Sequence, residues 1–192
     1  MSEKKVNLIL GQRGSGKSYL AKHLIKGNYR VIIYDTLCEY TEGVTIENIP
    51  EFKQFFLKFY QKSFRIIYQP SNPTPEDFEL ICGIVYECEE LTFLVEEIDK
   101  FCSAQSITDN FANIIQRGRH KNITLIGVSQ RPFGINKLIT SQAKIIHSFI
   151  HREPRDLEYL RIFIGEEADQ IKDLKEYEYL EWNNGKVSIK KL

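Results

Sequence analysis

Residues 11–18 have the types and the spacing that bind a chain of phosphates. Their sequence, GQRGSGKS, matches G-x-x-x-x-G-K-[ST] at every fixed position. Glycines let backbone N–H groups turn toward an anion, and a helix beginning here adds the partial positive charge of its N-terminus. Lys17 is placed to neutralise the β- and γ-phosphates, and the Ser18 hydroxyl is placed to ligate Mg²⁺. We therefore expect ATP and Mg²⁺ to bind here, with the nucleotide contacted by Gly11, Gln12, Arg13, Gly14, Ser15, Gly16, Lys17, Ser18 and Tyr19.

The segments on either side of this motif have the strand and helix patterns that a phosphate-binding loop requires. An apolar run, residues 6–10, comes before it and predicts a short buried strand, while residues 19–25 have helical spacing. Strand, glycine loop and helix in this order form the phosphate-binding unit, so a chance glycine-rich turn is disfavoured.

Two acids, Glu96 and Glu97, follow the apolar run at residues 91–95. A carboxylate in this place suits the Mg²⁺ shell, because a hard cation prefers oxygen ligands. The next residue points the other way along a strand and suits a general base that polarises the attacking water. We assign Glu96 to the metal and Glu97 to the water. The alternative is that both acids only begin a helix.

A glutamine, Gln130, ends the strand predicted at residues 123–128. An amide at that point can hydrogen-bond both the γ-phosphate and the attacking water, and so report whether the phosphate is present. The alternative is an amide that only caps the strand.

The one dense basic cluster is residues 116–121, QRGRHK. Arginine binds phosphate with two parallel hydrogen bonds, and an arginine from a neighbouring subunit could stabilise the transition state. We expect Arg119, ahead of Arg117, to act in this way. The simpler alternative is that the cations offset a helix C-terminal dipole, with Gly118 as the cap.

Apolar runs alternate with helical segments along the chain, which predicts a mostly parallel sheet covered on both faces. Ligands of such sheets bind at the carboxyl ends of the strands, where the glycine loop, the two acids and Gln130 all fall. Strands are predicted at 6–10, 30–34, 64–68, 91–95, 123–128 and 144–150, helices at 19–25, 51–62, 76–90, 107–116, 155–164 and 166–174, and a β-hairpin at 177–190 turning through Asn-Gly.

Length and composition set further limits. The chain has 192 residues, which suits one domain (1–192), with a core at about 6–150 and terminal helices and a hairpin at about 151–192. The formal net charge is zero, so no global field attracts nucleic acid or a membrane. Neither a signal sequence nor a long apolar run is visible, and the cysteines lack zinc spacing. We expect a cytoplasmic or virion-associated protein without membrane insertion.

Taken together, GQRGSGKS, YDTLCEY, FLVEEID and RGRHKNITLIGVSQRP resemble the HerA/FtsK superfamily of DNA-pumping ATPases. The resemblance covers about residues 6–150. It implies the three-layer α/β P-loop NTPase fold of the RecA/ASCE type, a hexameric ring and double-stranded DNA in a central channel. It also implies the roles given above for Lys17, Ser18, Glu96, Glu97 and Gln130, with Arg119 or Arg117 reaching the adjacent subunit. One departure is that Glu96 stands where many members have Asp.

An ATPase core of this size is similar to viral genome-packaging ATPases. This resemblance implies a capsid or portal protein as a further partner. The alternative function is an ATP-driven phage-assembly factor of the zonula occludens toxin type, which acts on a protein. A small-molecule kinase is a lesser alternative, with Arg152, Arg155 and Arg161 as candidates for a substrate lid. A GTPase is disfavoured because Asn136-Lys137-Leu138-Ile139 does not complete N-K-x-D.

Overall fold

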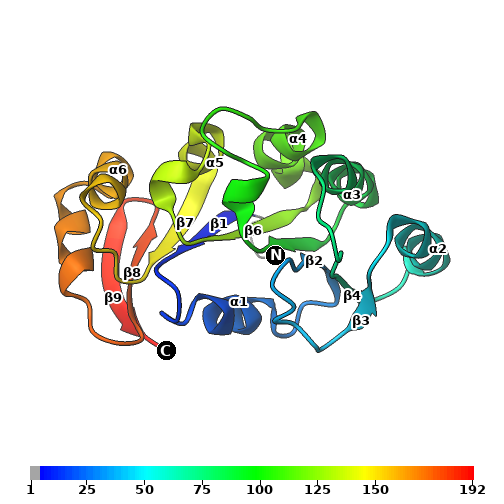
Figure 1. Ribbon diagram of the computed structural model, residues 1–192, viewed down its shortest axis with the longest axis horizontal. Coiled ribbons are helices and arrows are strands. Elements are labelled where there is room, and N and C mark those ends of the chain that lie inside the picture. Colours follow the sequence, from blue (N-terminus) through cyan, green and yellow to red (C-terminus); the bar gives the residue numbers. More distant parts are fainter. Residues whose placement is uncertain (1–4) are drawn as a thin grey trace.

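The computed structural model describes residues 5–192 as a single nine-stranded sheet flanked by helices (Figure 1). The strands are β1 (Val6–Leu10), β2 (Arg30–Tyr34), β3 (Val44–Ile46), β4 (Phe64–Tyr68), β5 (Thr92–Val95), β6 (Thr124–Ser129), β7 (Ala143–Ser148), β8 (Glu178–Asn183) and β9 (Lys186–Lys191). The α-helices are α1 (Lys17–Ile25), α2 (Ile49–Phe59), α3 (Pro75–Cys88), α4 (Asp109–Arg117), α5 (Lys137–Gln142) and α6 (Pro154–Ile164). Short 3₁₀ helices are η1 (Ile98–Lys100), η2 (Gly118–Lys121), η3 (Pro132–Gly134) and η4 (Glu166–Asp173).

The strand order is β3-β4-β2-β5-β6-β1-β7-β8-β9. Every pairing from β3 to β7 is parallel, while β8 and β9 pair antiparallel as a hairpin at the edge. The predicted mostly parallel sheet with a C-terminal hairpin is therefore confirmed. Because the central strands are parallel, the loops that follow β1, β2, β5 and β6 meet at one edge of the sheet.

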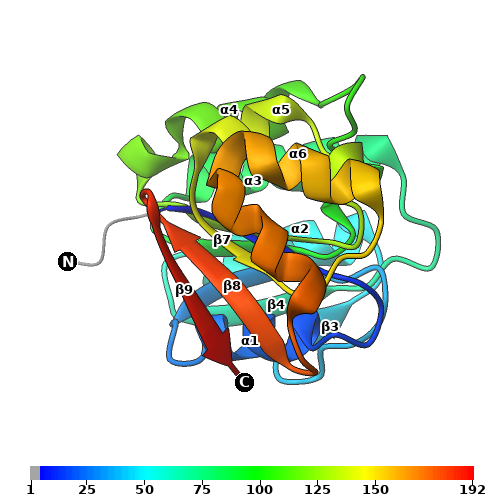
Figure 2. The ribbon, with the colours of Figure 1, turned by 90° about the vertical axis from the view of Figure 1, so that its left-hand side faces the viewer.

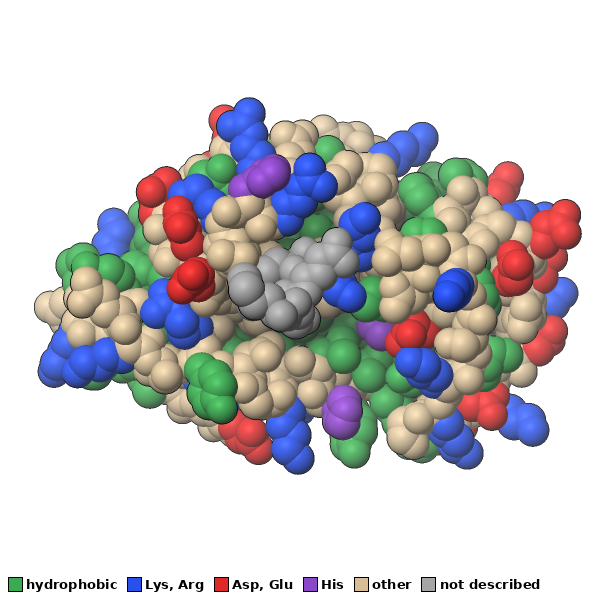
Figure 3. Space-filling view, turned by 180° about the vertical axis from the view of Figure 1, so that it is seen from behind, with side chains coloured by type: hydrophobic (Ala, Val, Ile, Leu, Met, Phe, Trp, Pro, Cys, Tyr) green, Lys and Arg blue, Asp and Glu red, His purple; other side chains and the backbone are tan. Residues whose placement is uncertain are grey.

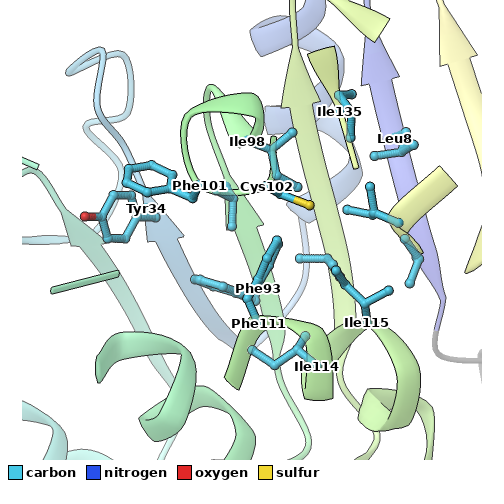
Figure 4. Close-up of a cluster of buried hydrophobic side chains, with 14 of the residues drawn as sticks. Leu8, Tyr34, Phe93, Ile98, Phe101, Cys102, Phe111, Ile114, Ile115 and Ile135 are labelled. Atoms are coloured by element: carbon cyan, nitrogen blue, oxygen red, sulfur yellow. The ribbon is translucent and has the colours of Figure 1, made fainter. Parts of the chain in front are cut away.

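Helices cover the two faces of the sheet unequally. α3, α4, α5 and α6 lie over one face, and α1 lies under the other (Figures 1 and 2). The larger core cluster includes Tyr34 and Phe93 from the sheet with Phe101 and Phe111 (Figure 4), and the ring of Phe78 packs against all four. On the opposite face, a smaller cluster joins the sheet to buried residues of α1 such as Leu20 and Ile25. The helix that follows the glycine loop is thus fixed by its own part of the core.

Helix starts follow local chemistry. The side chain of Asn48 accepts a hydrogen bond from the backbone of Glu51 at the start of α2, and Thr74 does the same for Asp77 at the start of α3. Pro75 occupies the first turn of α3, where its missing N–H costs nothing. Among the aromatic side chains of α2, Phe52 is fully buried.

Three elements differ from the sequence prediction, besides the short 3₁₀ helices η1, η2 and η3, which were not predicted either. The segment expected as an α-helix at 166–174 is the 3₁₀ helix η4, whose first hydrogen bond spans three residues, from Ala168 N–H to Gly165 C=O. Strand β3 was not predicted, because it has three residues and two of them are exposed. Helix α5 was missed because its six residues are too few for a periodic pattern. Among the described residues, no helix is both long and apolar enough to cross a bilayer.

Candidate functional site

The glycine loop joins β1 to α1 in the conformation that its sequence predicts. Gly14 and Gly16 have φ values of 77° and 106°, in the left-handed region that glycine adopts without strain. Lys17 is the first residue of α1 and is only 8% exposed. Its Nζ donates a hydrogen bond to the carbonyl of Gln12 at 2.9 Å. The ammonium group therefore lies inside the loop, where a phosphate chain would meet it.

A cavity of about 600 Å³ opens at the carboxyl ends of the parallel strands. It contains residues from four separate segments: the glycine loop, the turn after β2, the end of β5 and the end of β6. The lining residues are Arg13, Gly14, Gly16, Lys17, Ser18, Tyr19, Leu37, Glu39, Glu96, Glu97, Val128, Ser129 and Gln130. The structure thus brings the predicted loop lysine, both acids and the glutamine into one cavity.

Glu96 is 1% exposed at the base of this cavity. Its Oε1 accepts a 2.6 Å hydrogen bond from the Tyr40 hydroxyl. Burial raises the pKa of Glu96 to about 7, against the opposing effects of the Tyr40 hydrogen bond and the Lys17 charge. The pKa of Lys17 is lowered by the same burial, and the charges of Glu96 and Glu39 oppose that change. The buried cation and the buried carboxylate therefore stabilise each other's charged forms.

Glu97 lies beside Glu96 but makes different contacts. Its backbone is in the left-handed region, with φ of 48°, so the chain turns sharply after Glu96. Its Oε2 accepts a hydrogen bond from the Thr36 hydroxyl at 2.8 Å and forms an ion pair with Lys100 at 2.5 Å. The two adjacent acids are thus held by separate partners, which relieves the repulsion expected between neighbouring carboxylates.

The end of β6 supplies Gln130 to the cavity. The preceding residue, Ser129, is buried and donates a 2.6 Å hydrogen bond to Asp99, while its oxygen accepts one from the backbone of Arg131 at 3.1 Å. Ser129 therefore fixes the strand end on which Gln130 stands. Asp99 was not predicted, although it belongs to the same FLVEEID segment as the two acids.

The structure separates Arg117 and Arg119 from this cavity. Arg117 ends α4 and Arg119 lies in η2, both before the amino end of β6. The six residues of β6, about 20 Å of strand, lie between that end and Gln130. Arg119 lines a separate small cavity with Lys5 and Lys144. In the view from behind, lysine and arginine side chains gather around a histidine near the upper edge (Figure 3). Neither arginine can reach the cavity of its own chain.

Three predicted nucleotide contacts do not line the main cavity. Gly11 packs behind the loop, where a Cβ would come within 2.6 Å of Phe149. Gln12 and Ser15 line an adjacent cavity of about 500 Å³, which lies between the loop and residues 174–178. The sequence did not predict roles for Thr36, Leu37, Lys100 and Asp99. The first two belong to the YDTLCEY segment, which entered the sequence analysis only through the family resemblance.

The donor set fits Mg²⁺ only together with phosphate. Among residues 5–192, no three His, Cys, Asp or Glu side chains form a cluster that could hold a metal alone. Mg²⁺ commonly takes one or two protein oxygens and completes its shell with phosphate and water. The Ser18 hydroxyl and the Glu96 carboxylate face the same cavity as Lys17 and supply such oxygens.

The buried position of Glu96 predicts a pH-dependent stability in metal-free buffer. The pKa of Glu96 is about 7 in the folded protein and 4.5 when unperturbed. Between these values the folded state retains a proton that the unfolded state has lost, so the free energy of unfolding falls as pH rises. Glu96→Gln keeps an acceptor for Tyr40 and lacks the titration. Urea denaturation with EDTA should therefore show wild type losing on the order of 1–3 kcal/mol relative to Glu96→Gln across this window.

The comparison with Glu96→Gln also controls for two histidines. Burial lowers the pKa values of His147 and His151 to about 4, so their effect on stability has the opposite sign and is common to both proteins. Parallel stability curves for the two proteins would contradict the assignment of a raised pKa to Glu96.

Comparison with known proteins identifies the fold through structure alone. No family model matches the chain, and no curated protein matches its sequence. The genome-packaging NTPase B204 of Sulfolobus turreted icosahedral virus 2, solved with ATP-γS, is similar with a TM-score of 0.82 and 23% identity. The match covers 100% of this chain and 98% of B204.

Two other solved structures share the fold more distantly. The N-terminal domain of zonular occludens toxin from Neisseria meningitidis matches with a TM-score of 0.55 and 14% identity, over 100% of this chain and 95% of that one. The conjugation coupling protein TcpA of pCW3, with ATPγS, matches with a TM-score of 0.67 and 11% identity, over 97% of this chain and 60% of TcpA. The chain therefore has the P-loop NTPase fold found in viral genome-packaging ATPases, as its sequence predicted.

Proposed function

We propose that this protein is a Mg²⁺-dependent ATPase motor that assembles into a hexameric ring and translocates double-stranded DNA, packaging a viral genome into a capsid. The observation that supports this most is the convergence of Lys17, Glu96, Glu97 and Gln130 on one cavity beside a glycine loop. The similarity to B204, a genome-packaging NTPase, favours packaging over other uses of this fold.

Binding of ATP depends on the glycine loop and on Lys17. The β- and γ-phosphates would take the place of the Gln12 carbonyl as the partner of the Lys17 ammonium. Mg²⁺, when bound, would neutralise charge that develops on the phosphates. Ser18 and Glu96 would hold that ion. The bound cation, together with Lys17, would favour the ionised form of Glu96, whose pKa is otherwise raised by burial. Arg13 and Tyr19, which also line the cavity, are exposed and free to contact the nucleotide.

Hydrolysis requires a base and a means of detecting the γ-phosphate. Glu97 would accept a proton from the attacking water through the oxygen that Thr36 and Lys100 do not engage. Gln130 would hydrogen-bond the water and the γ-phosphate from the carboxyl end of the neighbouring strand β6. Ser129 fixes that strand end through its hydrogen bond to Asp99. Loss of the γ-phosphate would therefore change the contacts at the carboxyl end of β6.

The transition state would gain from an arginine of a neighbouring subunit, in addition to Lys17. Arg119 and Arg117 lie near the amino end of β6, and the phosphate site lies at the carboxyl ends of the strands. In a head-to-tail ring, the amino ends of one subunit would face the cavity of the next, which would place Arg119 on the neighbour's γ-phosphate. Ring assembly would then be required for rapid hydrolysis.

DNA is the proposed substrate, although the net charge of the chain is zero. Local basic clusters gathered by the ring would have to supply the phosphate contacts, so DNA binding should depend strongly on salt. The second candidate is an assembly factor that moves a protein. It is favoured by the match to the zonular occludens toxin domain over the whole chain.

The first experiment measures ATP hydrolysis with and without duplex DNA. Wild type should hydrolyse ATP with Mg²⁺ and respond to DNA. Lys17→Ala should lose nucleotide binding, whereas Glu97→Gln should bind ATP and lose about 10²–10⁴-fold in kcat. Glu87→Gln, an exposed acid on α3, is the control for the loss of one carboxylate. Hydrolysis that ignores every nucleic acid but responds to a protein partner would exclude the DNA motor and support the assembly factor.

The second experiment mixes two inactive variants. Arg119→Ala leaves an intact cavity without its partner arginine, and Lys17→Ala leaves an intact arginine without a working cavity. If Arg119 acts on the neighbour's nucleotide, the mixture should regain part of the wild-type rate, measured as phosphate release. Arg155→Ala, an exposed arginine of α6, should retain the wild-type rate by itself. A mixture no more active than its two components would contradict action between subunits.

A further inference from the structure

A buried phenol lies against the carboxylate that we assign to the metal. The Tyr40 side chain is 3% exposed, and its hydroxyl donates a hydrogen bond to Glu96 Oε1 at 2.6 Å. Such a short O–H···O⁻ distance is typical of a hydrogen bond to a charged acceptor. This contact fixes one of the two carboxylate oxygens of Glu96.

Tyr40 is itself held in place through its backbone. Its N–H donates to Asp35 Oδ2 at 2.9 Å, and its carbonyl accepts a hydrogen bond from Gln69 Nε2 at 3.0 Å. Gln69 Nε2 also lies 2.7 Å from Asp35 Oδ2, and Leu37 N–H donates to Asp35 Oδ1 at 3.2 Å. Asp35 is completely buried. The turn after β2 is therefore tied both to its own strand and to the end of β4.

The Tyr40 ring is fixed as firmly as its backbone. It belongs to the core cluster between the sheet and α1, and the Lys22 ammonium lies 5.3 Å from the ring centroid. A hydroxyl on a ring with so little freedom presents its hydrogen in one direction. The position of the phenol is thus set before any ligand binds.

Glutamate needs such a partner more than aspartate does. It has one more rotatable bond, and ordering each additional side-chain torsion costs conformational entropy. Nearby carboxylates of Glu39 and Asp35 also repel the Glu96 charge. A fixed hydrogen bond to Oε1 removes the torsional freedom and offsets the repulsion.

We propose that Tyr40 is a positioning residue, whose hydroxyl holds Oε1 of Glu96 so that Oε2 faces the cation beside the triphosphate. The proposal rests on the proposed function, because it assumes that Glu96 is a metal ligand. It accounts for a glutamate at a position where a shorter aspartate would need no such support. The tyrosine does not touch nucleotide or metal, so its effect is on metal affinity first and on turnover through it.

The test measures Mn²⁺ affinity by electron paramagnetic resonance, with a non-hydrolysable ATP analogue bound. Tyr40→Phe removes one oxygen atom and should weaken Mn²⁺ binding about tenfold or more, as loss of such supporting groups typically does. Affinity for the analogue in EDTA should stay within about twofold, since Lys17 and the loop are intact. Tyr34→Phe is the matched control. Tyr34 is buried on β2, and its hydroxyl has no hydrogen-bond partner among residues 5–192.

A second background separates positioning from a general structural effect. In Glu96→Asp, the shorter carboxylate cannot keep both the phenol and the cation, so adding Tyr40→Phe should change Mn²⁺ affinity by less than about twofold. If Tyr40→Phe weakened Mn²⁺ binding by the same factor in wild type and in Glu96→Asp, the proposal would be overturned. Gln69→Met, which removes the anchor of the Tyr40 carbonyl, should weaken Mn²⁺ binding in the same direction by a smaller factor. This variant keeps the test decisive if Tyr40→Phe does not fold.

The two proposals fail in different ways. If wild type binds the analogue but shows no bound Mn²⁺, the metal site of the proposed function is wrong. If wild type binds Mn²⁺ and Tyr40→Phe or Gln69→Met binds it equally well, only the positioning role of Tyr40 is wrong.

Discussion

Everything at this site depends on two opposite charges buried in one cavity. Lys17 and Glu96 are 8% and 1% exposed, and burial alone would drive both toward their neutral forms. Each charge favours the ionised form of the other group, and Tyr40 adds a hydrogen bond to the carboxylate. A triphosphate with its cation would complete the same balance, because it brings negative charge to the lysine and positive charge to the glutamate. The free protein therefore already holds the two charges with which such a ligand would pair.

The parallel sheet is what brings these charges together. Strands β2 and β5 are neighbours, with Tyr34 paired to Val95, and the backbone N–H of Glu96 donates to the Tyr34 carbonyl at 3.0 Å. The turn after β2 thus lies directly beside the two acids after β5. β1 lies between β6 and β7, so the glycine loop opens next to the strand end that bears Gln130. The same parallel arrangement places Arg119 at the opposite end of the strands, away from the cavity of its own chain.

Sequence reasoning was sufficient where chemistry and local pattern coincide. The glycine loop and the hairpin turn at Asn184-Gly185 are encoded by contiguous residues, and apolar runs located the central strands. The contacts that complete the site were not predictable in this way. Tyr40 meets Glu96 across 56 residues, and Thr36 meets Glu97 across 61, because β2 and β5 are adjacent only in the folded sheet. Without the strand order, nothing in the YDTLCEY segment shows that its side chains lie beside the two acids.

A crystal structure with Mg²⁺ and a non-hydrolysable ATP analogue tests the central claim most directly. The account predicts the γ-phosphate between Lys17 and Gln130, with the metal on Ser18 and Glu96 and with Glu97 facing the γ-phosphate across one water. Phosphates bound outside the 600 Å³ cavity, or a metal shell that excludes Glu96, would contradict it.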